Sequence, residues 1–152
     1  MPTYEKTYTA IWADMDPNGH MRHSAYTDYA AHTRVDFLAK QGFTMQYFAE
    51  HALGPILFRE DTRFLREVKM GDEITVTSEV AGLNADGSRW RIVHTIKKPD
   101  GIVAATVTVD GAWLDLRRRK LTVPPPEIAE AMATAARHES YQDIVKGDKE
   151  EK

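Results

Sequence analysis

The sequence contains no cysteine, carries little net charge and lacks a long apolar run. Its 152 residues include 20 basic and 23 acidic side chains, which leave a formal net charge of −3. Without cysteine, disulfides, thiolate metal sites and a cysteine nucleophile are excluded. A small negative net charge disfavours nucleic acid as a partner, because nucleic-acid-binding surfaces are usually basic. No apolar run approaches the ~20 residues that span a bilayer, so we expect no membrane partner.

Two further kinds of signal are missing. The N-terminus, "MPTYEKTYTA", has no basic segment followed by an apolar one, so it does not resemble a secretory signal peptide and we expect a cytoplasmic protein. Neither GxGxxG nor GxxxxGK occurs, which argues against dinucleotide-binding and P-loop folds. The length suits one domain, which we assign to residues 1–145. The charged end "KGDKEEK", residues 146–152, is predicted to be a disordered tail.

A single strand followed by a long helix opens the predicted domain. Residues Thr3–Ala13 alternate aromatic and polar side chains, which indicates a strand. After "DMDPNGHMRH", a loop rich in turn-forming residues, Ser24 can cap a helix that runs to Gln41, where Gly42 favours a stop. A shorter helix is expected over Met45–His51.

Four later segments show the two-residue period of strands. Their ranges are Ile56–Arg66, Glu73–Leu83, Arg89–Lys98 and Ile102–Leu116. Tight turns at "NADG" and "PDG" join the last three into an antiparallel meander. The segment "VPPPEIAEAMATAARH" then predicts a C-terminal helix with proline in its first turn. This order predicts an α+β fold in which one long helix packs on a five-stranded antiparallel sheet.

The loop before the long helix gathers most of the residue types used in catalysis. Loops held by a rigid scaffold often carry functional residues. Two other interpretations stay open on the residues alone. The aspartates can simply form turns while the histidines are solvated, or Asp16, His20 and His23 can bind a metal ion, although no established zinc spacing is matched. The residues of this loop are Asp14, Asp16, Asn18, His20, Arg22 and His23.

The segment "IWADMDPNGHMRHSAYTDYAAHTR" resembles the acyl-CoA thioesterases of the 4-hydroxybenzoyl-CoA thioesterase family, which have the hotdog fold. Two later segments, "REDTRFLREVKMGDEITV" and "WLDLRRRKLTVPPP", are similar to the middle and closing strands of that family. The likeness extends from about Tyr4 to Pro126. It implies a single hotdog domain, with a five-stranded antiparallel sheet wrapped around one long helix. The motif residues are Trp12, Asp16, Gly19, His20, Tyr26, Tyr29 and Arg34.

The resemblance implies hydrolysis of an acyl-CoA thioester, with Asp16 as the catalytic carboxylate. Asp16 would attack the thioester carbonyl or activate the water that does so. The resemblance assigns oxyanion stabilisation to the backbone N–H of His23, at a helix N-terminus whose first N–H groups lack intrahelical partners. His20 either positions water or substrate, or only packs, and Tyr26 is a candidate substrate contact. Asp14 is assigned to the loop itself.

Other residues have both a functional and a structural interpretation. Glu60 and Asp61 are an alternative base or solvated strand residues. The aromatic side chains of the strands and helix line a pocket or belong to the core. The basic run "RRRK" is solvated surface or a contact for the phosphates of coenzyme A, since the resemblance places it near the nucleotide. Its members, predicted as substrate-binding residues, are Arg117, Arg118, Arg119 and Lys120.

The resemblance also implies the partners. Thioester hydrolysis of this kind requires no metal or organic cofactor, and coenzyme A is part of the substrate. Hotdog protomers usually pair edge to edge, so we expect a homodimer or a dimer of dimers with the active sites at the interface. Two alternatives remain. One is a hotdog enoyl-CoA hydratase or dehydratase. Such enzymes carry the pattern Asp-x-Asn-Pro-hydrophobic-His, and the segment "DMDPNGH" nearly matches it. The other is a non-catalytic acyl-CoA-binding protein.

Overall fold

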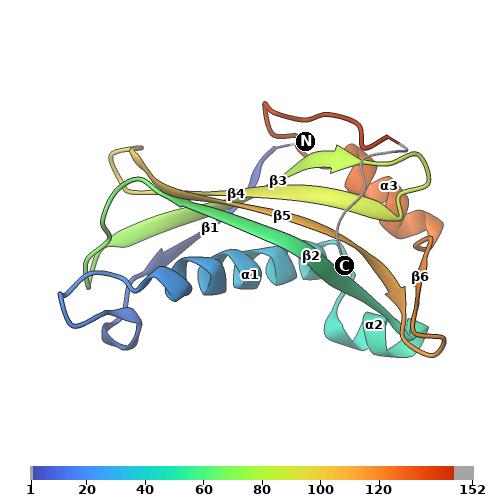
Figure 1. Cartoon of the computed structure of the whole chain (residues 1–152), viewed down its shortest axis with the longest axis horizontal. Helices are drawn as coiled ribbons and strands as arrows, with labels where there is room; N and C mark the ends of the chain where they lie inside the picture. Colours follow the sequence, from blue (N-terminus) through green and yellow to red (C-terminus); the bar gives the residue numbers. More distant parts are fainter. Residues whose placement is uncertain (1, 146–152) are drawn as a thin grey trace.

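A computed structural model describes residues 2–145 and shows one antiparallel sheet with a long helix, α1 (His23–Lys40), across one face (Figure 1). The strands lie in the order β1-β3-β4-β5-β2, and a short β6 pairs with β5. This architecture confirms the predicted α+β hotdog fold, while the tail predicted at residues 146–152 lies outside the described residues. The strands are β1 (Tyr4–Thr9), β2 (Leu53–Phe64), β3 (Glu73–Leu83), β4 (Arg89–Lys97), β5 (Val103–Asp115) and β6 (Lys120–Thr122).

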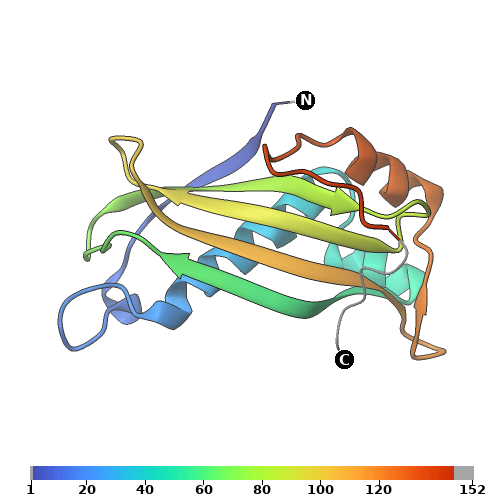
Figure 2. The ribbon, with the colours of Figure 1, turned by 45° about the horizontal axis from the view of Figure 1, so that its top comes forward.

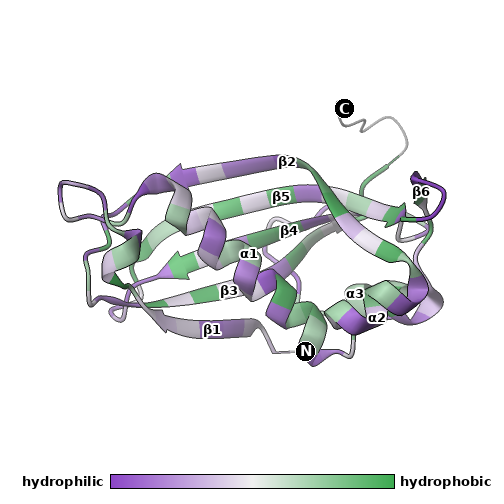
Figure 3. Ribbon diagram, turned by 90° about the horizontal axis from the view of Figure 1, so that it is seen from below, coloured by the Kyte–Doolittle hydropathy of each residue, from purple (hydrophilic) through white to green (hydrophobic). Residues whose placement is uncertain are grey.

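Small residues allow α1 to lie close to the sheet. Ala25 and Ala30 are fully buried, and Phe37 continues the buried stripe toward the end of the helix. Figure 3 shows α1 crossing the strands on this face. Lys6 of β1 pairs with Asp36 of α1 at 3.9 Å. This ion pair explains why a charged residue stands among the aromatic side chains of that strand.

Two short helices lie at the end of the sheet where α1 ends. They are α2 (Met45–His51) and α3 (Pro126–Thr134), and both views place them at this end (Figures 1 and 3). The hydroxyl of Tyr47 in α2 donates a hydrogen bond to Glu127 in α3 at 2.9 Å. Among the described residues, no helix is long and apolar enough to cross a membrane.

The first strand is shorter than predicted. β1 ends at Thr9, because residues Trp12–Asp14 form a 3₁₀ turn closed by backbone hydrogen bonds. Trp12 consequently lies on the surface with 79% of its area exposed. The predicted strand over Thr3–Ala13 is therefore too long, because it does not continue through Trp12.

The start of α1 also differs from the prediction. The helix begins at His23 and its N-cap is Arg22, which makes no side-chain capping hydrogen bond. The hydroxyl of Ser24, the predicted cap, instead accepts a hydrogen bond from the guanidinium of Arg22 at 2.5 Å. The first turn of α1 therefore has no side-chain cap.

The C-terminal segment completes one edge of the sheet. β1 pairs with β3 only over Glu73–Ser78. Beyond a register shift near Val80, residues 136–144 follow the same edge of β3 through backbone hydrogen bonds to Val80, Ala81 and Leu83 (Figure 2). At the opposite side of the sheet, β2 pairs with β5 and has no further strand among the described residues.

Candidate active site

The loop before α1 is a small hairpin anchored to the segment before β3. Met15 and Met21 form an antiparallel bridge, and the N–H of Arg22 donates to the carbonyl of Asp14 at 2.8 Å. The N–H of Met21 also donates to the carbonyl of Val68 at 2.7 Å. The hairpin therefore holds the chain in a defined position as it enters α1.

Asp16 lies in the turn of this hairpin with one carboxylate oxygen committed. Its Oδ1 accepts hydrogen bonds from the N–H groups of Asn18 at 2.9 Å and His20 at 3.1 Å. Gly19 has a φ of +83°, a conformation that favours glycine and lets the turn close. No hydrogen bond reaches Oδ2 from the described residues. The loop therefore orients the carboxylate through one oxygen and leaves the other available.

His23, the first residue of α1, is exposed and contributes through its backbone. The N–H groups of His23 and Ser24 have no hydrogen-bond partner among the described residues. The first N–H groups of a helix carry partial positive charge and favour an anion or a developing oxyanion. The uncapped start of α1 can therefore supply such donors close to the Asp16 hairpin.

Asp14, in contrast, uses both carboxylate oxygens inside the loop. Its Oδ2 accepts from the hydroxyl of Tyr29 at 2.6 Å, and its Oδ1 lies 3.4 Å from the guanidinium of Arg22. Burial and the hydrogen bond to the Asp14 carboxylate raise the pKa of Tyr29 to about 12. These contacts tie the hairpin to α1 and agree with the assignment of Asp14 to the loop.

Tyr26 of α1 and His20 of the hairpin both lie near Asp16. Tyr26 is buried and packs edge-on against Phe64, with ring centroids 5.1 Å apart. Its pKa is raised, mainly by burial, with contributions from the negative charges of Glu67 and Asp16. The Nε2 of His20 lies 3.3 Å from a carboxylate oxygen of Glu67. Tyr26 thus belongs to the surroundings of Asp16, whereas the His20 ring is directed to the anchoring segment.

The alternative metal site is not assembled. Within residues 2–145, no group of three or more His, Asp or Glu side chains is arranged to hold a metal ion. The ring of His20 is paired with Glu67, and His23 lies exposed at the helix start. Asp16, His20 and His23 therefore do not form the metal-binding set that their sequence spacing left open.

The basic run lies at the other end of the molecule. Residues 117–119 form the turn between β5 and β6, the short strand that the sequence pattern did not predict. Asp115 holds this turn, since its Oδ1 accepts from the N–H groups of Arg117 and Arg118, each at 3.0 Å. Figure 1 shows the turn and the Asp16 hairpin at opposite ends of the sheet. One chain therefore does not bring the predicted catalytic and phosphate-binding residues together.

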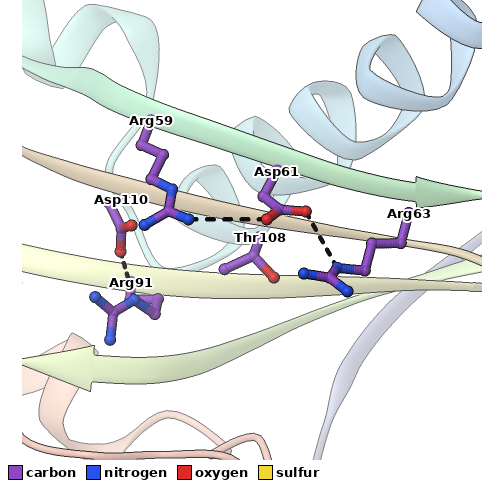
Figure 4. A pocket seen from close by; sticks show the side chains of 6 residues that line it. All are labelled: Arg59, Asp61, Arg63, Arg91, Thr108 and Asp110. Carbon is purple, nitrogen blue, oxygen red and sulfur yellow. Dashed lines mark hydrogen bonds and ion pairs between the residues drawn. The ribbon is translucent and has the colours of Figure 1, made fainter.

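The alternative base Asp61 lies on the face of the sheet away from α1. It pairs with Arg59 at 3.9 Å and with Arg63 at 3.4 Å, beside the half-buried ion pair of Arg91 and Asp110 (Figure 4). The negative charge of its carboxylate is therefore balanced by neighbouring arginines, and the sheet separates it from the hairpin. This arrangement argues for a structural role of Asp61.

A second group of functional residue types lies between α1 and β4. Nη1 of Arg34 lies 2.9 Å from Nε2 of His94, whose Nδ1 is 3.0 Å from the carbonyl oxygen of Thr77. A guanidinium can only donate, so Nε2 accepts and the proton of the neutral ring resides on Nδ1. Burial and the Arg34 charge lower the pKa of His94 to about 3. Sequence periodicity did not single out His94, because a buried histidine on a strand looks like any other inward position.

Arg34 also borders a cavity of about 120 Å³ that sequence reasoning did not foresee. Trp90 forms part of its wall and lies opposite Gly111 in the register of β4 and β5. A Cβ atom at Gly111 would collide with the Trp90 ring and with the carbonyl of Ile56, so glycine at this position seats the ring against β5. The cavity is lined by Arg34, Val35, Leu38, Pro55, Leu57, Trp90, Ile92, Trp113 and Met132.

Comparison with known proteins gives the family. The model of the thioesterase-like superfamily matches residues 11–132, which include the hairpin, α1 and β2 to β5. The chain belongs to the thioesterase-like superfamily. No curated protein matches its sequence at a significant level.

Solved structures share the fold of this superfamily member. A hypothetical protein from Staphylococcus aureus, solved in complex with CoA, aligns with a TM-score of 0.83 and 22% identity over 97% of this chain and 90% of that one. A 1,4-dihydroxy-2-naphthoyl-CoA thioesterase from Synechocystis aligns with a TM-score of 0.78 and 16% identity, covering 88% of this chain and 97% of the other. At these identities the likeness establishes the hotdog fold.

The buried His94 makes stability depend on pH. Its pKa is about 3 in the folded protein, against about 6.5 for an unperturbed histidine. The unfolded chain therefore binds an extra proton between these values, so the free energy of unfolding falls as pH drops from about 6.5 toward 3. At pH 4 we expect this group alone to cost roughly 3 kcal/mol relative to pH 7.

Urea unfolding at pH 7 and pH 4 checks this expectation. The control is His94→Gln, whose amide can still accept from Arg34 and donate to the Thr77 carbonyl but does not titrate. The wild type should lose more stability than His94→Gln between the two pH values. Equal losses in both proteins would show that His94 does not carry this pH dependence.

Proposed function

We propose that this protein hydrolyses acyl-CoA thioesters to a free acid and coenzyme A. The observation that carries the proposal is the Asp16 carboxylate, oriented through Oδ1 and available at Oδ2, beside the uncapped N-terminus of α1. Membership of the thioesterase-like superfamily supports it, as do structural neighbours solved with CoA or named as CoA thioesterases. The predicted cytoplasmic location and the absence of a cofactor belong to the same proposal.

The proposed chemistry uses two groups of the hairpin and helix start. The thioester carbonyl oxygen accepts a hydrogen bond from the N–H of His23, which stabilises the oxyanion as it develops. Oδ2 of Asp16 either attacks the carbonyl carbon, giving an anhydride that water then cleaves, or removes a proton from the attacking water. The C–S bond breaks and coenzyme A leaves as a thiolate, which is a good leaving group. No strong general acid is needed for this reason.

The free edge of β2 supports a symmetric dimer. This strand has 12 residues and exposes apolar side chains, with Leu57 42% and Phe64 52% exposed. A long edge strand with apolar residues pairs readily with another strand unless it is covered. We therefore propose that two copies join their β2 edges antiparallel about a two-fold axis, as a dimer or within a dimer of dimers.

Antiparallel pairing would also bring the separated site residues together. β2 begins beside the basic turn, since Leu53 pairs with Asp115, and it ends beside the hairpin, where Phe64 contacts Tyr26. Two antiparallel β2 strands place the start of one beside the end of the other. The hairpin of one copy would then face residues 117–120 of the second copy, whose cations can bind the phosphates of coenzyme A.

Asp16→Asn tests the catalytic role. The variant keeps the shape of the side chain and its acceptor at the turn but loses the carboxylate. Positioned acid–base groups contribute roughly 10²–10⁴ in rate, so kcat should fall at least about 100-fold with little change in substrate binding. Steady-state thiol release measures it.

Two variants are controls for Asp16→Asn. Asp14→Asn should cost much less, because Asp14 holds the loop rather than the substrate. His23→Ala should also be mild, since the proposed donor is its backbone N–H. A folded Asp16→Asn protein with near-normal turnover would contradict the assignment and make Glu60 the next candidate base.

A mixed dimer tests whether each site uses both copies. Arg118→Glu with Lys120→Glu should raise KM for acyl-CoA far more than for acyl-pantetheine, which lacks the nucleotide phosphates. When this double variant is mixed with Asp16→Asn, each mixed dimer contains one site with an intact Asp16 and an intact basic turn. Acyl-CoA hydrolysis at normal KM should therefore reappear.

Three results would contradict the shared site. The first is a mass of one chain, 17.2 kDa, by light scattering at micromolar concentration. The second is an equal rise in KM for both substrates. The third is a mixed dimer that never recovers the wild-type KM, because this outcome would place the basic turn and Asp16 of one copy in the same site.

A further inference from the structure

The cavity beside Arg34 has one cationic donor group, the guanidinium, in an otherwise apolar lining. Its lining comes from α1, β2, β4, β5 and α3, and all members other than Arg34 and the two tryptophans are aliphatic or thioether side chains. The indole nitrogens of Trp90 and Trp113 are fully buried, so these two residues line the cavity with carbon atoms of their rings.

Arg34 itself carries a positive charge that the described chain leaves largely unbalanced. Among the described residues, its only hydrogen bond is to the neutral ring of His94. No carboxylate of these residues lies within 4.0 Å of the guanidinium. Burial lowers the pKa of Arg34, while the negative charge of Glu60, an exposed residue of β2, raises it. Arg34 is half-buried, so its cation is only partly solvated and has no close anionic partner among the described residues.

We propose that this cavity binds the acyl group of the substrate and that the group ends in a carboxylate held by Arg34. The inference rests on the proposed thioesterase function and names its substrate class. Arg34 has four further N–H donors in a planar fork, which suits a carboxylate. The aliphatic side chains and the tryptophan rings of the lining hold the methylene groups.

The size and position of the cavity define the substrate further. An apolar cavity of about 150 Å³ binds benzene, so a cavity of about 120 Å³ takes a short acyl group. Arg34 lies eleven residues after His23 on α1, about 16 Å along the helix axis. Pro55 and Leu57 line the cavity at the start of β2, which is the part of the strand that the end of a second copy's β2 would reach. The cavity of one copy therefore receives the acyl group of a substrate whose thioester lies at the hairpin of the second copy.

Binding of two matched CoA thioethers tests the inference without requiring hydrolysis. One analogue carries a four-carbon chain that ends in a carboxylate, and the other carries an uncharged alkyl chain with the same number of non-hydrogen atoms. Titration calorimetry of the wild type should give at least about tenfold tighter binding of the carboxylate form, as expected for a charge-assisted hydrogen bond.

Variants of Arg34 assign the preference to this residue. Arg34→Met should reverse the preference for the carboxylate analogue, because the cavity then lacks its cation. Arg34→Lys should keep part of this preference. The matched control is Arg137→Gln, which removes an exposed arginine stacked on Tyr141 and should leave the preference unchanged. If Arg34→Met fails to fold, comparing the binding of the two analogues to the wild type still tests the inference.

The outcomes separate this inference from the proposed function. Equal binding of the two analogues, or a preference that survives in a folded Arg34→Met protein, overturns the inference even if uncharged acyl-CoAs are hydrolysed. A carboxylate preference that depends on Arg34, in a protein that releases no thiol from any acyl-CoA, supports the cavity assignment while the thioesterase function fails.

Discussion

The packing of α1 on the sheet is the contact on which both parts of the site depend. Because Ala25 and Ala30 are fully buried, the helix backbone lies close to the strands and cannot shift without opening the core. This contact positions the uncapped start of α1 at the hairpin of Asp16. It equally positions Arg34, near the middle of the helix, against His94 and the cavity.

In the proposed mechanism, turn formation and catalysis use the same side chain of the hairpin. Asp16 closes its turn through Oδ1, and Gly19 supplies the left-handed conformation that the turn needs. The same hydrogen bonds restrict the carboxylate, so Oδ2 is presented at little further entropic cost. Asp14, two residues earlier, has both oxygens engaged by Tyr29 and Arg22. The two neighbouring aspartates thus differ in their hydrogen bonds, and only Asp16 keeps an oxygen available for the proposed chemistry.

The sequence predicts the local features well. Period-two runs and turn residues define β2 to β5 within a few residues, and the Asp16 loop is recognisable from its turn formers and its resemblance to a family. Predictions failed where a tertiary contact determines the local conformation or the relative position of two segments. Trp12 continues the alternation of β1 in the sequence, yet the strand ends at Thr9 and Trp12 begins a 3₁₀ turn. The relative positions of residues 117–120 and Asp16 follow from sheet order, which periodicity does not encode. The cavity depends on Trp90 lying against Gly111, a cross-strand pair with no sequence signal.

The central claim is that the protein breaks the thioester bond, and product analysis tests it most directly. The purified full chain should be incubated with saturated and 2,3-unsaturated acyl-CoAs, including short carboxylate-ended, aromatic and long-chain forms, while free thiol and the acyl product are measured together. Thioester hydrolysis predicts equal amounts of coenzyme A thiol and free acid from at least one saturated substrate. Addition of water to the double bond with the thioester intact, or tight binding of all substrates without thiol release, would contradict the account.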